Sequence, residues 1–220
     1  MTVCVIGNSH AGSLLKAFNT LPDARQLDWA FYSAADSYRD NAGLNAIAYD
    51  AKQGAFVDFP YHRGNHGPNA VIGNHDCFVL VGAHPAPVRM ARWLNQEMSD
   101  RFRAAAVAEI CRYAPLDRFV RLIRQSSPAR ILLMTRPAPS RDQPVPGADA
   151  AITEELIAEY WATRDVELVR QPAVTMTRDG MTRPAFHKPN DNQHYSPEGA
   201  MLALQAVRVA LDAPRAVRTS

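Results

Sequence analysis

The chain has 220 residues, of which 47% are hydrophobic and 21% charged, and its formal net charge is +2 at pH 7. These values are ordinary for a globular protein with a substantial core. The arginines are scattered and form no basic block that could follow a phosphate backbone, so nucleic acid is not an expected partner. No apolar run approaches the length of a membrane span, and the first strand is expected at about Thr2. We therefore predict a cytoplasmic protein without a membrane partner.

The chain opens with a strand, a polar turn and a helix. The apolar run from Val3 stops at Gly7, Asn-Ser-His follows at positions 8 to 10, and apolar residues then recur at helical spacing from Leu14. Ser9 is thus expected at the carboxyl edge of a strand and at a helix amino terminus, where free N–H groups favour negative charge. Such a position suits a serine nucleophile. The alternative is that the polar turn only caps the helix.

Strands and helices alternate along the rest of the chain. Further strands are predicted at about 27–32, 76–82, 130–135 and 166–169, and helices at about 95–113, from 115, at 150–163 and from 197 to 211. The last helix has Ser196 as its expected N-cap and Pro197 at its first position. Residues 41–76 are predicted as an irregular insertion of small hairpins or a long excursion. The pattern predicts one α/β domain over 1–220, with a parallel sheet covered on both faces.

A second polar block precedes the last helix. Asp191 and His194 are spaced as Asp-x-x-His in a predicted loop. A loop there can place the imidazole over the carboxyl edge of the sheet, with the aspartate near its other nitrogen. The histidine would take the proton of a serine hydroxyl, and the aspartate would fix the tautomer and support the imidazolium. We therefore predict Ser9, His194 and Asp191 as a catalytic triad.

With these two blocks the chain resembles the SGNH/GDSL hydrolases, whose first block is usually Gly-Asp-Ser and whose last is Asp-x-x-His. Here the first block reads Gly7-Asn8-Ser9-His10, with Asn in place of Asp. The resemblance implies a three-layer α/β/α sandwich with a five-stranded parallel sheet. It also implies a serine esterase that acts through an acyl-enzyme on Ser9, without metal or organic cofactor.

The resemblance is weaker in the middle of the chain. The family's oxyanion hole uses the N–H of the serine, the N–H of a glycine after the second strand and an Asn side chain after the third. In this chain the corresponding candidates are Ser9, Gly43 and the pair Gly82 and His84, where His stands in place of Asn. A neutral imidazole can donate an N–H, so the role could survive. The block Gly73-Asn74-His75-Asp76 is the alternative, but it precedes the third strand.

Three groups of side chains have structural interpretations. His62, His66, His75 and His84 are interpreted as polar loop residues rather than a metal site, because Pro and Gly break the helix that a metal pair would need. The three tryptophans, Trp29, Trp93 and Trp161, are interpreted as core or cleft-wall residues. The three cysteines, Cys4, Cys77 and Cys111, are predicted to be reduced core residues rather than a disulfide framework.

We predict hydrolysis of a small acyl ester, with an acylated carbohydrate favoured over a long-chain lipid. Two alternatives stay open: an O-acyltransferase acting on a sugar or polysaccharide, and a catalytically silent carbohydrate-binding relative. The oligomeric state is left open.

Overall fold

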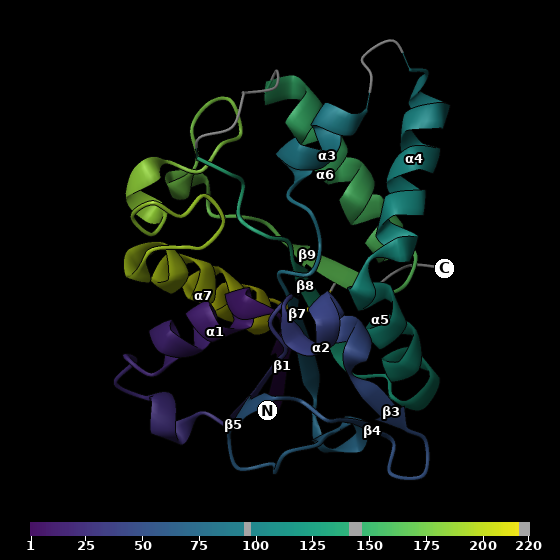
Figure 1. The fold of residues 1–220 in the computed structure, drawn as a ribbon, viewed down its shortest axis with the longest axis vertical. Helices are drawn as coiled ribbons and strands as arrows, with labels where there is room; N and C mark the ends of the chain where they lie inside the picture. Colours follow the sequence, from purple (N-terminus) through teal and green to yellow (C-terminus); the bar gives the residue numbers. More distant parts are fainter. Residues whose placement is uncertain (95–97, 141–146, 216–220) are drawn as a thin grey trace.

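A computed structural model describes residues 1–94, 98–140 and 147–215, and its centre is a six-stranded sheet in the order β5-β2-β1-β7-β8-β9 (Figure 1). Five of the strands are parallel: β1 (Val3–Gly7), β2 (Trp29–Ser33), β7 (Cys77–Val81), β8 (Arg130–Met134) and β9 (Val166–Val169). The sixth, β5 (Tyr61–Arg63), lies antiparallel to β2 at the edge. The predicted five-stranded parallel sheet is therefore present, and the insertion adds an edge strand that the sequence did not indicate.

Helices cover both faces of this sheet, as the continuous apolar runs of its strands require. Every residue of β1 and β7 is buried. Alternate residues of β1 face opposite layers, so that Val5 belongs to one hydrophobic core and Ile6 to the other. The result is the predicted three-layer α/β/α sandwich, with one core on each side of the sheet.

Two helices from opposite ends of the chain form one outer layer. These are α1 (Ser9–Phe18) and α7 (Pro197–Asp212), which lie side by side in Figure 1 and in contact. Leu14 of α1 and Val207 of α7 pack with Val5 in one core. This pairing brings the first and last polar blocks of the sequence to the same edge of the sheet.

Four helices form the other layer. They are α3 (Pro87–Trp93), α4 (Asp100–Tyr113), α5 (Pro115–Ser126) and α6 (Gly147–Ala162). Trp161 of α6 and Phe119 of α5 are buried in the core on this side. The helix predicted at 95–113 begins only at Asp100, after Ser99, whose hydroxyl accepts the Phe102 N–H at 3.3 Å. Positions 95–97 of that prediction lie outside the described residues.

The insertion is more ordered than the sequence indicated. After the short turn α2 (Tyr38–Asn41), strands β3 (Ala48–Asp50), β4 (Ala55–Val57) and β6 (Ala70–Val71) form a second, antiparallel sheet. Phe56 of this sheet contacts Phe119 of α5, with ring centroids 4.5 Å apart. The insertion is thereby joined to the core. Single 3-10 turns occur at Ala24–Gln26, Gly43–Ala46, Ile72–Asn74, Ala173–Thr175 and Pro184–Phe186.

The cysteines Cys4, Cys77 and Cys111 are all buried and free, as predicted. Within the described ranges, no helix has the length and apolar character needed to cross a membrane.

Candidate active site

In the turn after β1, the structure assigns the role of helix cap, which the sequence left open for Ser9, to another residue. Asn8, not Ser9, is the N-cap of α1, and its Oδ1 accepts the backbone N–H of His10 at 3.2 Å. Capping by Asn8 leaves the Ser9 hydroxyl available for other partners. Gly7 is also needed here, because a Cβ at this position would lie 2.4 Å from the carbonyl oxygen of Val81. The chain can therefore turn closely against β7 and present Ser9 at the surface.

The three residues predicted as a triad form one line of hydrogen bonds. Ser9 Oγ lies 2.7 Å from His194 Nε2, and His194 Nδ1 lies 2.7 Å from Asp191 Oδ2. The side chains of His194 and Asp191 are about a quarter exposed, at 25% and 29%. Residues 185 positions apart thus meet where β1 ends and α1 begins.

Asp191 is held in its ionised form by its hydrogen bonds. Burial alone would raise the pKa of its carboxyl group, but Oδ1 accepts the backbone N–H groups of Gln193 at 2.8 Å and His194 at 3.0 Å, and Oδ2 bonds the His194 ring. These bonds lower the pKa of Asp191 to about 2. An ionised carboxylate at Nδ1 directs the ring proton to that nitrogen, which leaves Nε2 free to accept from Ser9.

The loop that carries Asp191 and His194 is fixed to the start of α7. The backbone N–H of Lys188 donates to the His194 carbonyl at 3.0 Å, and His187 Nδ1 lies 2.9 Å from the same oxygen. Ser196 Oγ accepts the Gly199 N–H at 3.2 Å, which confirms Ser196 as the N-cap. The loop backbone therefore sets the direction of the catalytic imidazole.

His10 is a residue of this site that the sequence interpretation missed. Its ring stacks on the His194 ring, with centroids 4.8 Å apart and planes at 23°. His10 is 4% exposed, and its Nδ1 has no hydrogen-bond partner among the described residues. Burial, followed by the nearby charges of His194 and Arg136, lowers the pKa of His10 to about 3. His10 is thus an uncharged ring near neutral pH, and it packs against the imidazole of His194.

Gly82 does not have the free N–H that was predicted for the oxyanion hole. Its N–H donates to the carbonyl of Met134 at 3.0 Å, as part of the contact between β7 and β8. Its φ of +81° favours glycine, and a Cβ there would lie 2.4 Å from Asn8 Oδ1 and 2.6 Å from His10 Cβ. Gly82 is therefore a glycine because the catalytic turn packs against it, and the prediction of a donor is corrected.

His84 is also placed differently from the prediction. It is fully buried, with Nδ1 2.9 Å from the Pro85 carbonyl and Nε2 3.2 Å from Cys111 Sγ, and its ring meets the edge of Trp161. Burial lowers its pKa to about 4. An oxyanion donor needs a ring N–H with no other partner, and His84 has partners at both nitrogens. It fills the core, and the prediction is corrected on this point.

The other two candidate donors for the oxyanion, Asn74 and Gly43, lie at opposite edges of the sheet. Asn74 ends the 3-10 turn before β7 and so lies at the amino edge, away from Ser9. Gly43, with φ of +52°, packs against Asp36, and a Cβ there would be 3.1 Å from Asp36 Cα. Asp36 Oδ1 in turn accepts the Asn8 amide at 3.2 Å. Gly43 therefore lies next to the catalytic turn, and its role as a donor stays a prediction.

The remaining histidines lie elsewhere. His66 Nε2 is 2.6 Å from Asp28 Oδ1, and the His66 ring meets the His75 ring with centroids 4.8 Å apart. His62 is exposed on β5. Over the part of the chain that the structure describes, no three His, Cys, Asp or Glu side chains are arranged to hold a metal ion.

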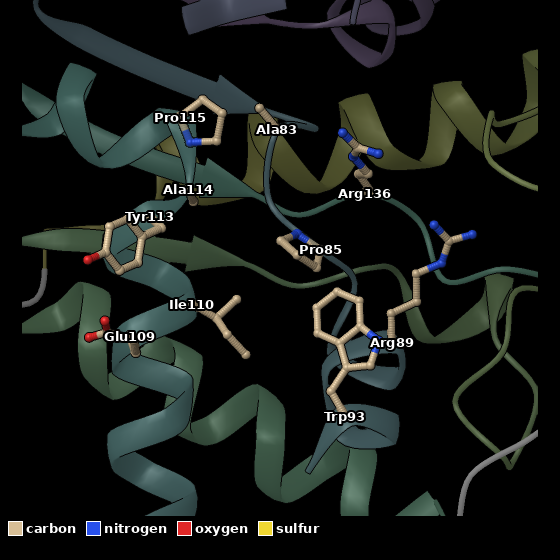
Figure 2. Close-up of a pocket in the computed structure, with 10 residues that line it drawn as sticks. All are labelled: Ala83, Pro85, Arg89, Trp93, Glu109, Ile110, Tyr113, Ala114, Pro115 and Arg136. Atoms are coloured by element: carbon tan, nitrogen blue, oxygen red, sulfur yellow. The ribbon is translucent and has the colours of Figure 1, made fainter. Parts of the chain in front are cut away.

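A pocket of about 520 Å³ opens at the carboxyl ends of β7 and β8 (Figure 2). Trp93 and Tyr113 are large aromatic residues in its wall, and they are 60% and 77% exposed. Trp29 and Trp161 are buried, so the interpretation of the tryptophans as core or wall residues is confirmed. The whole lining consists of Ala83, Pro85, Arg89, Trp93, Glu109, Ile110, Tyr113, Ala114, Pro115 and Arg136.

Comparison with known proteins identifies similar solved structures. No protein-family model and no curated protein matches the chain. Among solved structures, a proposed acylhydrolase from Bacteroides fragilis aligns with 96% of this chain and 86% of its own, at 14% identity and a TM-score of 0.49. A GDSL-like lipase from Bacteroides thetaiotaomicron aligns over 96% and 87%, at 10% identity and a TM-score of 0.46. The chain has the three-layer α/β/α fold that its resemblance to the SGNH/GDSL hydrolases implied, with the two end blocks of the sequence at one sheet edge.

Proposed function

We propose that this protein is a serine-dependent hydrolase of small acyl esters. The observation that carries the proposal is the hydrogen-bonded line from Ser9 through His194 to Asp191, with both bonds at 2.7 Å. This is the arrangement that activates a serine hydroxyl, because the proton has an acceptor and the acceptor is oriented by an ionised carboxylate. A surface serine that only capped a helix would have no need of such partners, and Asn8 already caps α1.

The chemistry follows from these positions. As Ser9 Oγ forms a bond to the ester carbonyl carbon, its proton passes to His194 Nε2 and the carbonyl oxygen becomes an oxyanion. His194 then gives that proton to the leaving alcohol, and an acyl-enzyme on Ser9 remains. A water molecule loses a proton to Nε2 as it attacks the acyl carbon. The acid departs, and the proton returns to Ser9.

The start of α1 supports this charge development. Ser9 is the first residue of a ten-residue helix, and the helix dipole favours negative charge beside its backbone N–H. That N–H is one donor for the oxyanion.

An acylated carbohydrate is the substrate class that we propose. The pocket of about 520 Å³ is in the range of small-ligand sites; Ser9 and His194 lie outside its lining, and Arg136 of the lining connects it to the catalytic turn through the Gly82 carbonyl. Its exposed aromatic residues Trp93 and Tyr113 offer flat apolar faces, and Glu109 and Arg89 add polar groups to the same lining (Figure 2). Such a mixture suits a ring with hydroxyl groups better than an unbranched hydrocarbon chain.

The test is hydrolysis of a short activated ester by the wild-type chain, by Ser9→Ala and by Ser13→Ala. Ser13 lies one turn further along α1 and takes no part in the hydrogen bonds that join Ser9, His194 and Asp191, so its variant is a matched control. We expect Ser9→Ala to lose about 10⁴-fold in turnover and Ser13→Ala to keep it. Equal activity in all three chains would refute the proposal. Product analysis with a sugar acceptor present would show acyl transfer in place of hydrolysis.

A further inference from the structure

The oxyanion of the proposed reaction has fewer protein donors than the sequence predicted. The Gly82 N–H donates to Met134, and both nitrogens of His84 have partners. The backbone N–H of Ser9 remains, with Gly43 as a predicted second donor. In acyl transfer one oriented donor contributes about 10²- to 10³-fold in turnover, so the identity of a further donor matters. A side chain that reaches this edge from another strand is Arg136.

The sheet order places Arg136 beside the nucleophile. Arg136 follows β8, and its Nη2 lies 3.0 Å from Oδ2 of Asp36, which follows β2. Because β1 and β7 lie between β2 and β8, this side chain crosses the carboxyl ends of both. Ser9 directly follows β1. The guanidinium must therefore lie at the edge where Ser9 attacks.

Hydrogen bonds connect Arg136 to the catalytic turn itself. Its Nε donates to the Gly82 carbonyl at 2.6 Å, and the side-chain amide of Asn8 donates to the same oxygen at 3.2 Å. Asn8 immediately precedes Ser9. The positive charge of Arg136 also contributes to lowering the pKa of His10, whose ring stacks on His194. The hydrogen bonds to Gly82 and Asp36 thus hold the guanidinium beside the turn that carries Ser9.

One end of the guanidinium is available for a ligand. Nε and Nη2 have the partners given above, and Nη1 has none among the described residues. The side chain is 28% exposed, and Figure 2 shows it at the Ala83 end of the pocket, away from Glu109 and Tyr113. The fixed planar fork leaves an oriented N–H pair at the boundary between the pocket and the catalytic turn.

We propose that Arg136 is a catalytic residue that donates to the oxyanion formed when Ser9 attacks the ester. It replaces the amide donor that His84 does not supply. The guanidinium stays protonated throughout, so it stabilises the developing negative charge without exchanging a proton. Because that charge appears only as the tetrahedral intermediate forms, the interaction should act on turnover much more than on substrate binding.

The experiment compares steady-state hydrolysis of a short activated ester by four variants. We expect Arg136→Ala to lower kcat about 10²- to 10³-fold with KM changed by less than about fivefold. Arg136→Lys keeps the charge but not the fork, so it should recover part of the loss. Asp36→Asn keeps one oxygen, which can accept from Arg136 or from Asn8 but not from both in the present geometry, so its loss should be smaller than that of Arg136→Ala. Arg170→Ala removes an arginine that follows β9, three strands from β1, and pairs with Glu155, so it should match the wild type.

Added guanidinium ion at non-denaturing concentration provides a second measurement. It should restore part of the turnover of Arg136→Ala and none of that of Ser9→Ala. Since the inference rests on the proposed ester hydrolysis, a fluorophosphonate is used to label each folded variant. If wild-type Ser9 takes no label, the proposed function fails and this inference fails with it. If wild-type Ser9 is labelled but Arg136→Ala keeps its kcat, this inference alone is overturned.

Discussion

Replacing Gly82 by alanine tests whether the catalytic turn packs against this residue as the structure shows. A Cβ would lie 2.4 Å from Asn8 Oδ1 and 2.6 Å from His10 Cβ, and φ at this position is +81°. A side chain in the left-handed region costs about 1–2 kcal/mol, and forcing a methyl group into a packed site costs about 1–3 kcal/mol. We therefore expect Gly82→Ala to reduce the free energy of unfolding by about 2–5 kcal/mol.

Urea unfolding measures this change directly. With a slope of about 2 kcal/mol per molar urea, the midpoint should fall by about 1–2.5 M. Gly12→Ala is the control. A Cβ added at Gly12 in α1 would meet no neighbouring group within 4 Å, so alanine there should raise the free energy of unfolding by about 0.5–1 kcal/mol. If Gly82→Ala and Gly12→Ala shift the midpoint alike, Gly82 is not a close-packing position and the description of the catalytic turn is wrong.

Three further predictions concern the histidines and Asp191. His194→Ala should reduce turnover more than Asp191→Asn, because the first removes the base and the second only its orientation and charge support; kinetics in the opposite order would reject these roles. His10→Phe keeps a flat ring against His194 and should retain more kcat than His10→Ala, and equal values would show that the stacked ring is dispensable. Burial lowers the pKa of His10 to about 3 and of His84 to about 4, whereas an unfolded histidine has a pKa of about 6.5. As the pH falls, the unfolded chain therefore takes up protons before the folded chain does. His10 and His84 should each lower the free energy of unfolding by about 2 kcal/mol between pH 7.5 and 5. Equal urea midpoints at the two pH values would contradict this.

The triad of Ser9, His194 and Asp191 could be predicted because the two sequence blocks that contain it are both local patterns. Ser9 follows an apolar run that can only be a buried strand, and the Asp-x-x-His block directly precedes a helix with a recognisable cap at Ser196. Parallel topology then brings the two blocks to one edge without knowledge of any distance. The five parallel strands could likewise be predicted from local apolar runs in the sequence.

The oxyanion donors could not be predicted in this way. Position along the chain places a residue near an edge, but it does not say where the side chain points or what its nitrogens bond. His84 is at the expected position and faces the core, where Cys111 and Trp161 surround it. The stacking of His10 on His194 and the reach of Arg136 to Asp36 depend on residues far apart in sequence. No pattern in a single sequence signals such pairs.

The differences in the fold have similar causes. Strand β5 is three exposed residues, so it lacks the alternation that marks a half-buried strand. Helix α3 begins at Pro87 and is not among the helices predicted from the sequence, although proline at the first helical position is a favoured start.

The central claim is that Ser9 is a nucleophile activated by His194. Intact-mass measurement after exposure to a fluorophosphonate, with peptide mapping of the adduct, tests it most directly. We predict one phosphonyl group per wild-type chain, located on Ser9. Ser9→Ala should take up none, and His194→Ala should react more slowly by several orders of magnitude. An adduct on another residue, or equal labelling of wild type and Ser9→Ala, would contradict the claim.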